Sequence, residues 1–523
     1  MQGEHGVSLK ELSSGSPDVS HHHLSRVQAE SCCCSQDLPA HLFAVPIIFA
    51  AGVTIALILQ IHLNASLAEV GRVAKKCTQV KVLPLLSHLL NTAALQVFLK
   101  GVVSDHERCT ALGERVLGDR GSSVDAAIAG ALCLGVMHPH VSGVGGGGVM
   151  LVHDIRRNET KVINFQGAAP ETFKEEMLQN GSEIKAGLLV GVPGMLLGLH
   201  RAHSLYGSLS WEDVVSRAAH VAREGFNVSL SLADAISKVK GERLQERFRN
   251  VFVPGGRALS PGSYVRMPGL AQVLQAGLHS FYHGELLQEM EDEVRGNGGV
   301  LSREDISNYD VETQDPLESP YHDLIVQVPP PPSAGAALIT ALNLLEGFHF
   351  RENNVTENQI HRWINESLTA ALALASGLGD PKANSSVTEL LSVMLSKHQA
   401  EVLRQKMIHS QTSPSDPHSL PPELLTGQVV VMGPDNLVVS VASSLSRPFG
   451  SRILTRSGIL LNGLVLHSSW PNGSSQDTGV QPGPRPLAFL MPSVLVPVRD
   501  KCGPYMALSS SGGPNRLSKV IQV

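Results

Sequence analysis

Beyond residue 110 the hydrophobic positions recur mostly with the period of a helix, and glycines separate the periodic segments. GDRGSSVDAAIAGALCLGVMHPHVSGVGGGGVMLVHD holds a capping pattern from Ser122 to Asp125, a helix of small residues, a glycine turn and a strand. GLLVGVPGMLLGLH continues the helical period, and LSREDISNYD opens another capped segment. Pro329 to Pro332 exclude a central strand or a helix interior, and AGAALITALNLL after them predicts a buried helix. We expect this region to be mostly helical.

The composition changes after residue 408. HSQTSPSDPHSLPPELL is rich in proline and serine and predicts an exposed linker. QVVVM, GPDN and LVVSVASSL then predict a strand, a turn and a second strand. Thr426 lies between the linker and this hairpin. Taken alone it is an ordinary threonine at the start of a strand, because β-branched residues favour strands.

One hydrophobic run has no helical or strand period. Residues 42–59, LFAVPIIFAAGVTIALIL, carry no charge, and the extended segment 42–63 is long enough to cross a bilayer. Its distance from the N-terminus favours an uncleaved signal anchor over a cleaved signal peptide. A buried core helix is the alternative. Residues 1–41 are polar without a hydrophobic period, and we expect a disordered cytoplasmic tail.

The orientation of this predicted anchor rests on two opposed signals. Basic residues are more numerous after the run than before it, which by the positive-inside rule would place the body in the cytoplasm. Asn-X-Ser/Thr sequons favour a lumenal or extracellular body, and all of them follow the run. They are Asn64, Asn158, Asn180, Asn227, Asn354, Asn365, Asn384 and Asn472. We therefore expect a single-pass type II membrane glycoprotein. Cys32 to Cys34, just before the run, are either palmitoylation candidates or a solvated reduced cluster.

Charge and glycine spacing exclude two classes of ligand. The formal net charge of -6, without a basic stripe, argues against nucleic-acid binding. Gly143, Gly145 and Gly148 match G-x-G-x-x-G, but a helix precedes them and a strand follows. A dinucleotide site needs the reverse order, so these glycines predict a turn.

Cysteine and histidine positions predict neither a metal site nor a cofactor. Cys133 lies in an apolar helix and is expected to be a small buried filler. His138 and His140 flank Pro139 without cysteine or carboxylate partners at ligand spacing. We expect these histidines to be solvated or to serve in packing.

Six ordered blocks between about residue 110 and residue 513 resemble the gamma-glutamyltransferases, also called glutathione hydrolases, most closely the divergent type six branch. The blocks are SSVDAAIAGALCLGVMHPHVSGVGGGG, VGVPGMLLGLH, FYHGELLQEM, LSREDISNYDV, SRPFGSRILTRSGILLN and RPLAFLMPSV. The resemblance implies a four-layer αββα fold of the N-terminal-nucleophile hydrolase kind behind one transmembrane helix. It also implies a precursor that cleaves itself before Thr426. The expected products are a heavy-chain-like region, 64–425 beyond the anchor, and a short light-chain-like region, 426–523, which form a heterodimer.

The resemblance also assigns chemistry to individual residues. The hydroxyl of Thr426 would attack the gamma-glutamyl bond of glutathione and its conjugates, and the new terminal amine would act as its base. Gly512 and Gly513 match a glycine pair of the oxyanion hole, with a plain turn as the alternative. Ser444 aligns with a threonine that supports the nucleophile, and Gln166 occupies the position of an arginine that binds substrate.

Several positions that bind charged groups in the family carry neutral residues here. Besides Gln166, these are Leu464 and His467 for two acidic residues, Ala488 and Phe489 for a serine pair, Gln428 for a histidine and Ser446 for an asparagine. A hydrogen bond to a charged group contributes roughly 1.5–3 kcal/mol, so three losses remove about 4–9 kcal/mol of substrate binding. A catalytically impaired relative that acts as a binding or partner protein is therefore the alternative function. With fewer strands after Gly513 than the family has, one edge of the second sheet is expected to need a cover.

Overall fold

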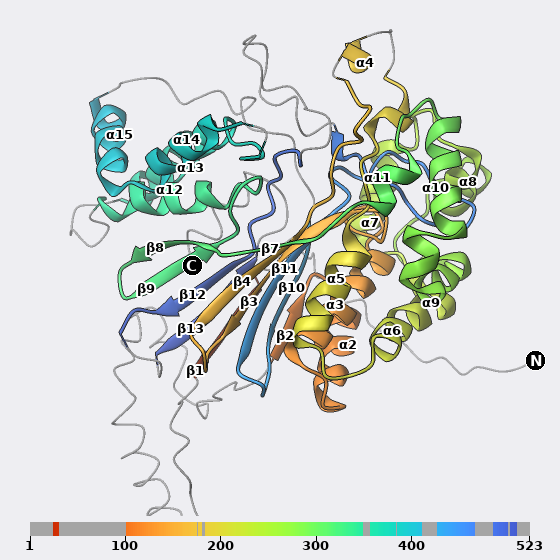
Figure 1. Ribbon diagram of the computed structural model, residues 1–523, viewed down its shortest axis with the longest axis horizontal. Helices are drawn as coiled ribbons and strands as arrows, with labels where there is room; N and C mark the ends of the chain where they lie inside the picture. The colour runs from red at the N-terminus through yellow and green to blue at the C-terminus, as the bar shows by residue number, and fades with distance from the viewer. Residues whose placement is uncertain are drawn as a thin grey trace, which may run out of the picture.

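The structure is a computed structural model that describes residues 25–30, 101–174, 176–179, 184–348, 356–382, 384–409, 426–465, 485–499 and 503–509. Two antiparallel sheets lie at its centre (Figure 1). One has the order β2 (Gly101–Ser104), β10 (Gly427–Met432), β11 (Leu437–Ser444), β3 (Gly147–Asp154), β4 (Glu159–Phe165) and β7 (Glu312–Gln314). The other has the order β1 (Ser25–Glu30), β13 (Pro504–Ser509), β12 (Ser493–Pro497), β9 (Leu324–Val328) and β8 (Leu317–Tyr321). A separate pair joins β5 (Phe226–Asn227) to β6 (Tyr264–Val265).

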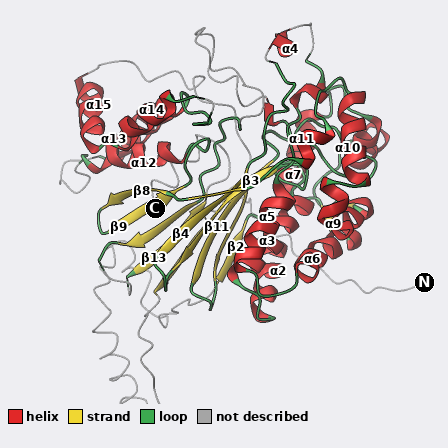
Figure 2. Ribbon diagram, viewed as in Figure 1, coloured by secondary structure: helices red, strands yellow, loops and turns green. Residues whose placement is uncertain are grey.

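Helices cover the outer face of each sheet (Figures 1 and 2). On the six-stranded sheet lie α2 (Glu107–Gly118), α3 (Ser123–Met137) and α5 (Met195–Tyr206). Further out on the same side lie α6 (Trp211–Glu224), α7 (Leu230–Val239), α8 (Glu246–Phe252), α9 (Pro268–Tyr282), α10 (Glu285–Gly296) and α11 (Arg303–Ser307). On the other sheet lie α12 (Gly335–Glu346), α13 (Glu357–Ala375), α14 (Ser386–Leu395) and α15 (Lys397–His409). A short helix α4 (Glu176–Gln179) and two 3-10 turns, Ala186–Leu189 and Pro254–Gly256, complete the described elements.

The alternation of side chains along β10 accounts for the layering. Val429 and Val431 join the core beneath α2 and α3, whereas Val430 and Met432 join a core that includes Val494 of the other sheet. Successive residues of a strand face opposite sides, so a strand buried on both faces needs a continuous apolar run. QVVVM supplies that run, and the result is four layers in the order helix, sheet, sheet, helix. The expected mixed α/β fold is confirmed.

The predicted elements recur in the structure with small changes at their ends. Capping boxes at Ser122 and Ser302 begin α3 and α11, as expected. All 15 residues of α3 are buried, because its alanines and glycines let α2 and α6 approach closely. The helix after the prolines is α12, and the hairpin after Thr426 is β10 and β11, with β10 beginning at Gly427.

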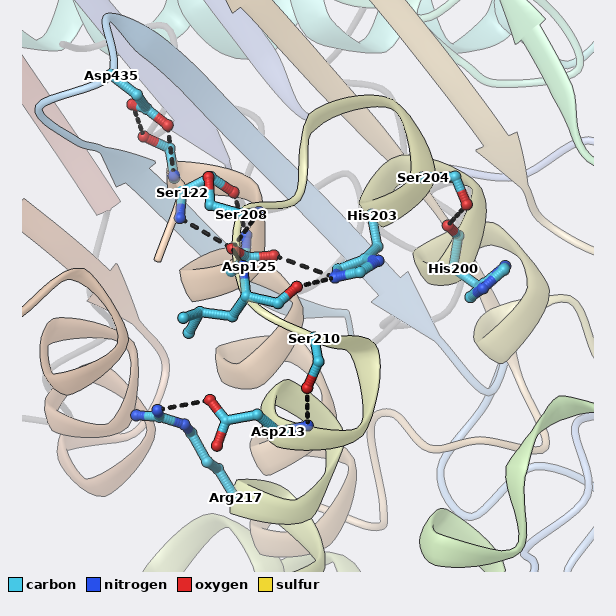
Figure 3. Close-up of polar contacts among 12 residues, drawn as sticks. Ser122, Asp125, His200, His203, Ser204, Ser208, Ser210, Asp213, Arg217 and Asp435 are labelled. Carbon is cyan, nitrogen blue, oxygen red and sulfur yellow. Dashed lines mark hydrogen bonds and ion pairs between the residues drawn. The ribbon is translucent and has the colours of Figure 1, made fainter. Parts of the chain in front are cut away.

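A buried carboxylate fixes the N-terminus of α3, the helix that leads into the glycine turn. Asp125 Oδ2 accepts hydrogen bonds from the backbone N–H groups of Ser122, Ser208 and Leu209 at 2.8–3.0 Å. His203 Nε2 lies 3.6 Å from the other carboxylate oxygen (Figure 3). Asp435, in the turn between β10 and β11, accepts from both the backbone and the hydroxyl of Ser123. The hairpin that follows Thr426 is thereby attached to α3.

Two expectations were wrong. Cys133 is buried, as expected, but it is not merely a filler: it forms a disulfide with Cys109 of α2, with Cα atoms 5.4 Å apart. Nor is the whole of residues 1–41 without regular structure, because Ser25–Glu30 form β1 and pair with β13. An open sheet edge pairs readily with any extended segment, and β1 covers the edge of β13 in this way.

The predicted anchor, residues 42–63, lies outside the described residues. Among the helices that the structure describes, none is both long and apolar enough to cross a membrane.

Candidate active site

Thr426 lies immediately before β10 and is 3% exposed. Gln428, two residues further on, donates a hydrogen bond from Nε2 to Thr426 Oγ1 at 2.6 Å. The backbone N–H of Gln428 in turn donates to Asp105 Oδ2 at 2.8 Å, and Asp105 directly follows the neighbouring strand β2. The threonine oxygen is thus an acceptor from a fixed neutral donor. That arrangement orients the hydroxyl and favours negative charge on its oxygen when the proton leaves.

Glycines bring the ends of three strands together beside Thr426. A Cβ on Gly146 would lie 2.3 Å from Ser444 O, and one on Gly147 would lie 2.5 Å from Gln166 O. No larger residue fits at either position without moving the backbone. The glycine run is therefore a turn of close backbone approach, as predicted. It leads into the start of β3, which pairs with the end of β11 on one side and with the end of β4 on the other.

Asn462 holds the loop that closes this region. Its Nδ2 donates to the carbonyl oxygens of Gly145 and Gly191, both at 2.9 Å. Its Oδ1 accepts from the N–H groups of Gly191 and Leu464 at 2.9 and 3.0 Å. A buried amide with every hydrogen-bonding position used rigidifies the segments it joins. Leu464 is thereby fixed at the site.

These elements enclose a pocket with about 310 Å³ of unfilled space, a figure that includes its open mouth. Backbone, hydroxyl, amide and apolar groups form its wall. The lining residues are Gly147, Gln166, Thr426, Ser444, Ser446, Leu464, Ala488, Phe489 and Leu490.

The structure gathers most of the residues that the sequence singled out. Thr426, Gln166 and Ser444 line one pocket although they come from three different strand ends. The positions of the neutral replacements Leu464, Ala488, Phe489 and Ser446 line it too. Gly512, Gly513 and His467 lie outside the described residues, as do Asn64, Asn180, Asn354 and Asn472.

Gln166, which belongs to the pocket wall, has one side-chain acceptor that the described contacts leave unused. Its Nε2 donates to the carbonyl oxygen of Pro486, which fixes the orientation of the amide because a carbonyl only accepts. Its Oε1 is buried and has no hydrogen-bond partner among the described residues. A buried acceptor without a partner is costly, and a ligand that donates a hydrogen bond would remove that cost.

A row of histidines joins the N-terminus of α2 to the C-terminus of α3. The rings of His106, His138 and His140 follow one another edge to face, with centroids 5.3 Å apart in each pair. Burial lowers the pKa of His138 to about 3 and that of His140 well below its usual value. The carbonyl of His140 accepts from the N–H of Phe449, just beyond β11. These rings are therefore neutral packing groups, so of the two expected roles packing is confirmed and solvation is wrong.

Sequence reasoning missed three features of the site: Asp105, Asn462 and the disulfide between Cys109 and Cys133. Asp105 and Gln428 are 323 residues apart. Asn462 carried no signal beyond its place at the end of the block SRPFGSRILTRSGILLN. Among the described residues, no cluster of histidine, cysteine and carboxylate groups could hold a metal ion.

Comparisons with known proteins agree on one family. Residues 109–523 match the family described as gamma-glutamyltranspeptidase. Glutathione hydrolase 7 of Homo sapiens is 45% identical over 512 residues, which cover 95% of this chain and 72% of that protein. Glutathione hydrolase 5 proenzyme of Mus musculus is 29% identical over 449 residues, covering 80% of this chain and 77% of that protein.

Two solved structures share the fold. Gamma-glutamyltranspeptidase from Helicobacter pylori is 26% identical with a TM-score of 0.53, and the match covers 61% of this chain and 93% of that one. Cephalosporin acylase from Bacillus halodurans has a TM-score of 0.67 at 24% identity, over 80% of this chain and 78% of that one. The second similarity is one of fold alone.

Proposed function

Because this chain belongs to the gamma-glutamyltranspeptidase family, we propose that it is a threonine acyltransferase or hydrolase activated by cleavage of its own chain between Leu425 and Thr426. The hydrogen bond from Gln428 to the buried hydroxyl of Thr426, beside a pocket, is the observation that carries this proposal. Gamma-glutamyl amides such as glutathione are the substrates that the names of its relatives suggest. The name proenzyme of the mouse relative accords with activation by cleavage.

The proposed chemistry uses one hydroxyl twice. In the precursor, Thr426 Oγ attacks the carbonyl carbon of Leu425, and the C–N bond between Leu425 and Thr426 breaks, which frees the amine of Thr426 and leaves an ester. Water then hydrolyses this ester, which separates the two chains and restores the hydroxyl. An α-amine has an ordinary pKa of about 7.7–8.0, so near neutral pH it can accept the hydroxyl proton. The hydroxyl then attacks the substrate carbonyl, the C–N bond breaks, and the amine product leaves with the proton. Water or an amine acceptor cleaves the acyl ester and restores Thr426.

Variants of Thr426 test this proposal. Wild type, Thr426→Ala and Thr426→Ser, each tagged at the C-terminus, are produced in secretory-pathway cells and compared on a reducing denaturing blot. We expect a fragment of residues 426–523 from wild type and, more slowly, from the serine variant, and only full-length chain from the alanine variant. A full-length band alone in all three would contradict self-cleavage. A fragment from the alanine variant would assign the cleavage to another protease.

A second candidate function follows from the lining of the pocket. Leu464, Ala488 and Phe489 occupy the wall where the family binds charged groups, which favours a chain that cleaves itself but does not turn over glutathione. Such a chain would act as a binding or partner protein. Purified cleaved protein that hydrolyses glutathione would exclude this candidate.

We also propose that the body lies in an oxidising compartment of the secretory pathway. The disulfide between Cys109 and Cys133 supports this, because disulfides rarely persist in the cytosol. The sequon asparagines that the structure describes, Asn158, Asn227, Asn365 and Asn384, are all exposed. Treatment with an N-glycosidase should therefore increase gel mobility, and replacing these four asparagines by glutamine should reduce that shift. A chain insensitive to the enzyme would contradict the assignment.

We further propose residues 42–63 as a membrane anchor, on the length of the uncharged run. A chain that crossed a bilayer there would hold Ser25–Glu30 on the opposite side from β13. The anchor and the pairing of β1 with β13 therefore exclude each other. Alkaline carbonate extraction distinguishes them, because an anchored chain stays with the membrane and an unanchored one is released.

A further inference from the structure

We propose that the pocket beside Thr426 accepts an uncharged acyl group that carries a hydrogen-bond donor. Amides of neutral acids the size of glutamate would then be its preferred substrates, and zwitterionic gamma-glutamyl amides would be poor ones. This inference rests on the proposed role of Thr426 as the nucleophile, and it names the substrate class of that site.

The side chains of the pocket wall are apolar or neutral. Leu464, Ala488, Phe489 and Leu490 present apolar side chains, and each is at most 6% exposed. The polar part of the lining consists of hydroxyl groups, the Gln166 amide and backbone. In the portion of the chain that the structure describes, the lining contains no acidic or basic side chain.

The basic residues next to the lining in sequence bind elsewhere. Arg485 donates to the carbonyl oxygen of Asp310 at 2.9 Å and forms an ion pair with Glu312. Arg447 donates from Nε to the carbonyl oxygen of Gly450 at 2.7 Å, and burial lowers its pKa. Neither side chain lines the pocket.

Burying the charges of a gamma-glutamyl group against this wall costs free energy. A gamma-glutamyl group carries a carboxylate and an ammonium group at the end remote from the bond that breaks. A charge moved from water to an apolar wall without a partner loses its hydration, whereas a hydrogen-bonded neutral amide does not. This wall therefore selects against both charged groups.

The Gln166 amide contributes an acceptor, Oε1, that is unused among the described contacts. The contact with Pro486 O occupies Nε2, so Oε1 is the amide atom left to bind a ligand. Oε1 accepts from an amide N–H or a hydroxyl and would repel a carboxylate. A neutral acyl chain ending in a carboxamide satisfies both the wall and this acceptor.

The reaction is ordinary acyl transfer. Thr426 Oγ bonds to the acyl carbon, the C–N bond breaks, and the leaving amine takes the hydroxyl proton through the terminal amine of Thr426. Water then attacks the ester, which releases the neutral acid and restores the hydroxyl. Water is the only co-reactant.

Three anilides of equal chain length test the inference: gamma-glutamyl, glutaryl and glutaramoyl. They differ only in carrying two charges, one negative charge, or none. With purified, self-cleaved full-length protein we expect kcat/KM for glutaramoyl anilide to exceed that of each of the others by at least about tenfold. Equal rates for the three, or a preference for gamma-glutamyl anilide, would overturn the inference and leave the proposed function intact.

The variant Gln166→Arg makes the test specific to this wall. A guanidinium at that position would pair with a carboxylate, so the ratio of glutaryl to glutaramoyl hydrolysis should rise at least about tenfold. Gln405→Arg, on the exposed face of α15, is the matched control and should keep the wild-type ratio. An unchanged ratio in folded Gln166→Arg would overturn the inference.

Failure of the proposed function would look different. If the cleaved protein hydrolyses none of the three anilides and intact-mass analysis finds no acyl adduct on the chain that begins at Thr426, Thr426 is not a nucleophile toward amides. Both proposals are then wrong. The wild-type ranking does not depend on the folding of any variant.

Discussion

At the scale of single residues, the site centres on the hydroxyl of Thr426, which accepts a hydrogen bond from a neutral amide. Gln428 is the described side chain whose donor reaches Oγ1, and Asp105 holds the backbone of Gln428 in place. A neutral amide cannot take the hydroxyl proton, so the base must come from elsewhere. The amine released by cleavage meets that need.

Removing the donor at Gln428 should slow self-cleavage. We expect Gln428→Ala to lower the first-order rate of cleavage about tenfold, because one hydrogen bond worth about 1.4 kcal/mol is lost in the transition state. Gln428→His restores an N–H donor and should recover part of the rate. Pulse-chase labelling measures both rates. A wild-type rate in the alanine variant would show that the contact has no role in cleavage.

Individual site residues were predictable only where a local pattern or the family resemblance marked them. A change of composition marks Thr426, and the family resemblance marks Gln166 and Ser444. The contact of Asp105 with Gln428 depends on β2 pairing with β10 across more than 300 residues of chain. The local sequence around either residue does not indicate this strand pairing.

At the scale of elements, matching N-terminal caps on two helices give a controlled comparison. Asp125 and Asp213 occupy equivalent positions after Ser122 and Ser210, but Asp125 is fully buried and binds three backbone N–H groups, whereas the side chain of Asp213 is 43% exposed and pairs with Arg217 (Figure 3). Asp125→Ala should lower the free energy of unfolding by about 3 kcal/mol or more, because buried donors lose their partner. Asp213→Ala should cost below about 1 kcal/mol. Chemical denaturation measures both, and similar losses would refute this account of α3.

The disulfide between α2 and α3 gives a second prediction for elements. It closes a loop of 24 residues, so Cys109→Ser should reduce the free energy of unfolding by about 3 kcal/mol under non-reducing conditions. Wild type in a reducing agent that reaches the buried sulfurs should approach the variant. Thermal unfolding with and without reductant is the measurement. A wild-type midpoint equal to that of the variant in both conditions would show that the bond does not stabilise the fold.

Elements were predictable when their own sequence was periodic. The capped helix from Ser123, the helix after the prolines and the hairpin after Thr426 follow from local patterns. β1 does not, because Ser25–Glu30 is short and mostly polar, and its pairing depends on the open edge of β13. The disulfide was not predicted for a related reason: pairing Cys109 with Cys133 requires knowing that α2 and α3 pack side by side.

At the scale of the whole molecule, buried histidines predict how stability depends on pH. Burial lowers the pKa of His138 to about 3 and that of His153 to about 4. The unfolded chain binds these protons near pH 6.5 and the folded chain only at lower pH, so protons favour unfolding within that window. The contribution of these histidines to the free energy of unfolding should be constant above pH 6.5. Below pH 6.5 the free energy of unfolding should decrease by about 1.4 kcal/mol per pH unit for each histidine, until the pH reaches the pKa of that histidine in the folded chain.

The variant His153→Gln isolates one of these contributions. His153 lies between the two sheets, where its Nδ1 is 2.8 Å from Thr160 Oγ1, and glutamine can occupy the site without titrating. The slope of unfolding free energy against pH between 6.5 and 4 should become shallower in the variant, whatever its stability at pH 7. An identical slope would show that His153 does not titrate differently in the folded and unfolded chains.

The proposed activity of the whole molecule depends on cleavage of one bond, the peptide bond before Thr426. Its most direct test is the N-terminal sequence and intact mass of the C-terminal fragment, isolated after removal of N-glycans from wild-type protein. We predict a chain that begins with Thr-Gly-Gln-Val-Val and extends to Val523. A fragment that begins at any other residue, or a preparation with only the uncleaved chain, would contradict the central claim that Thr426 is the nucleophile.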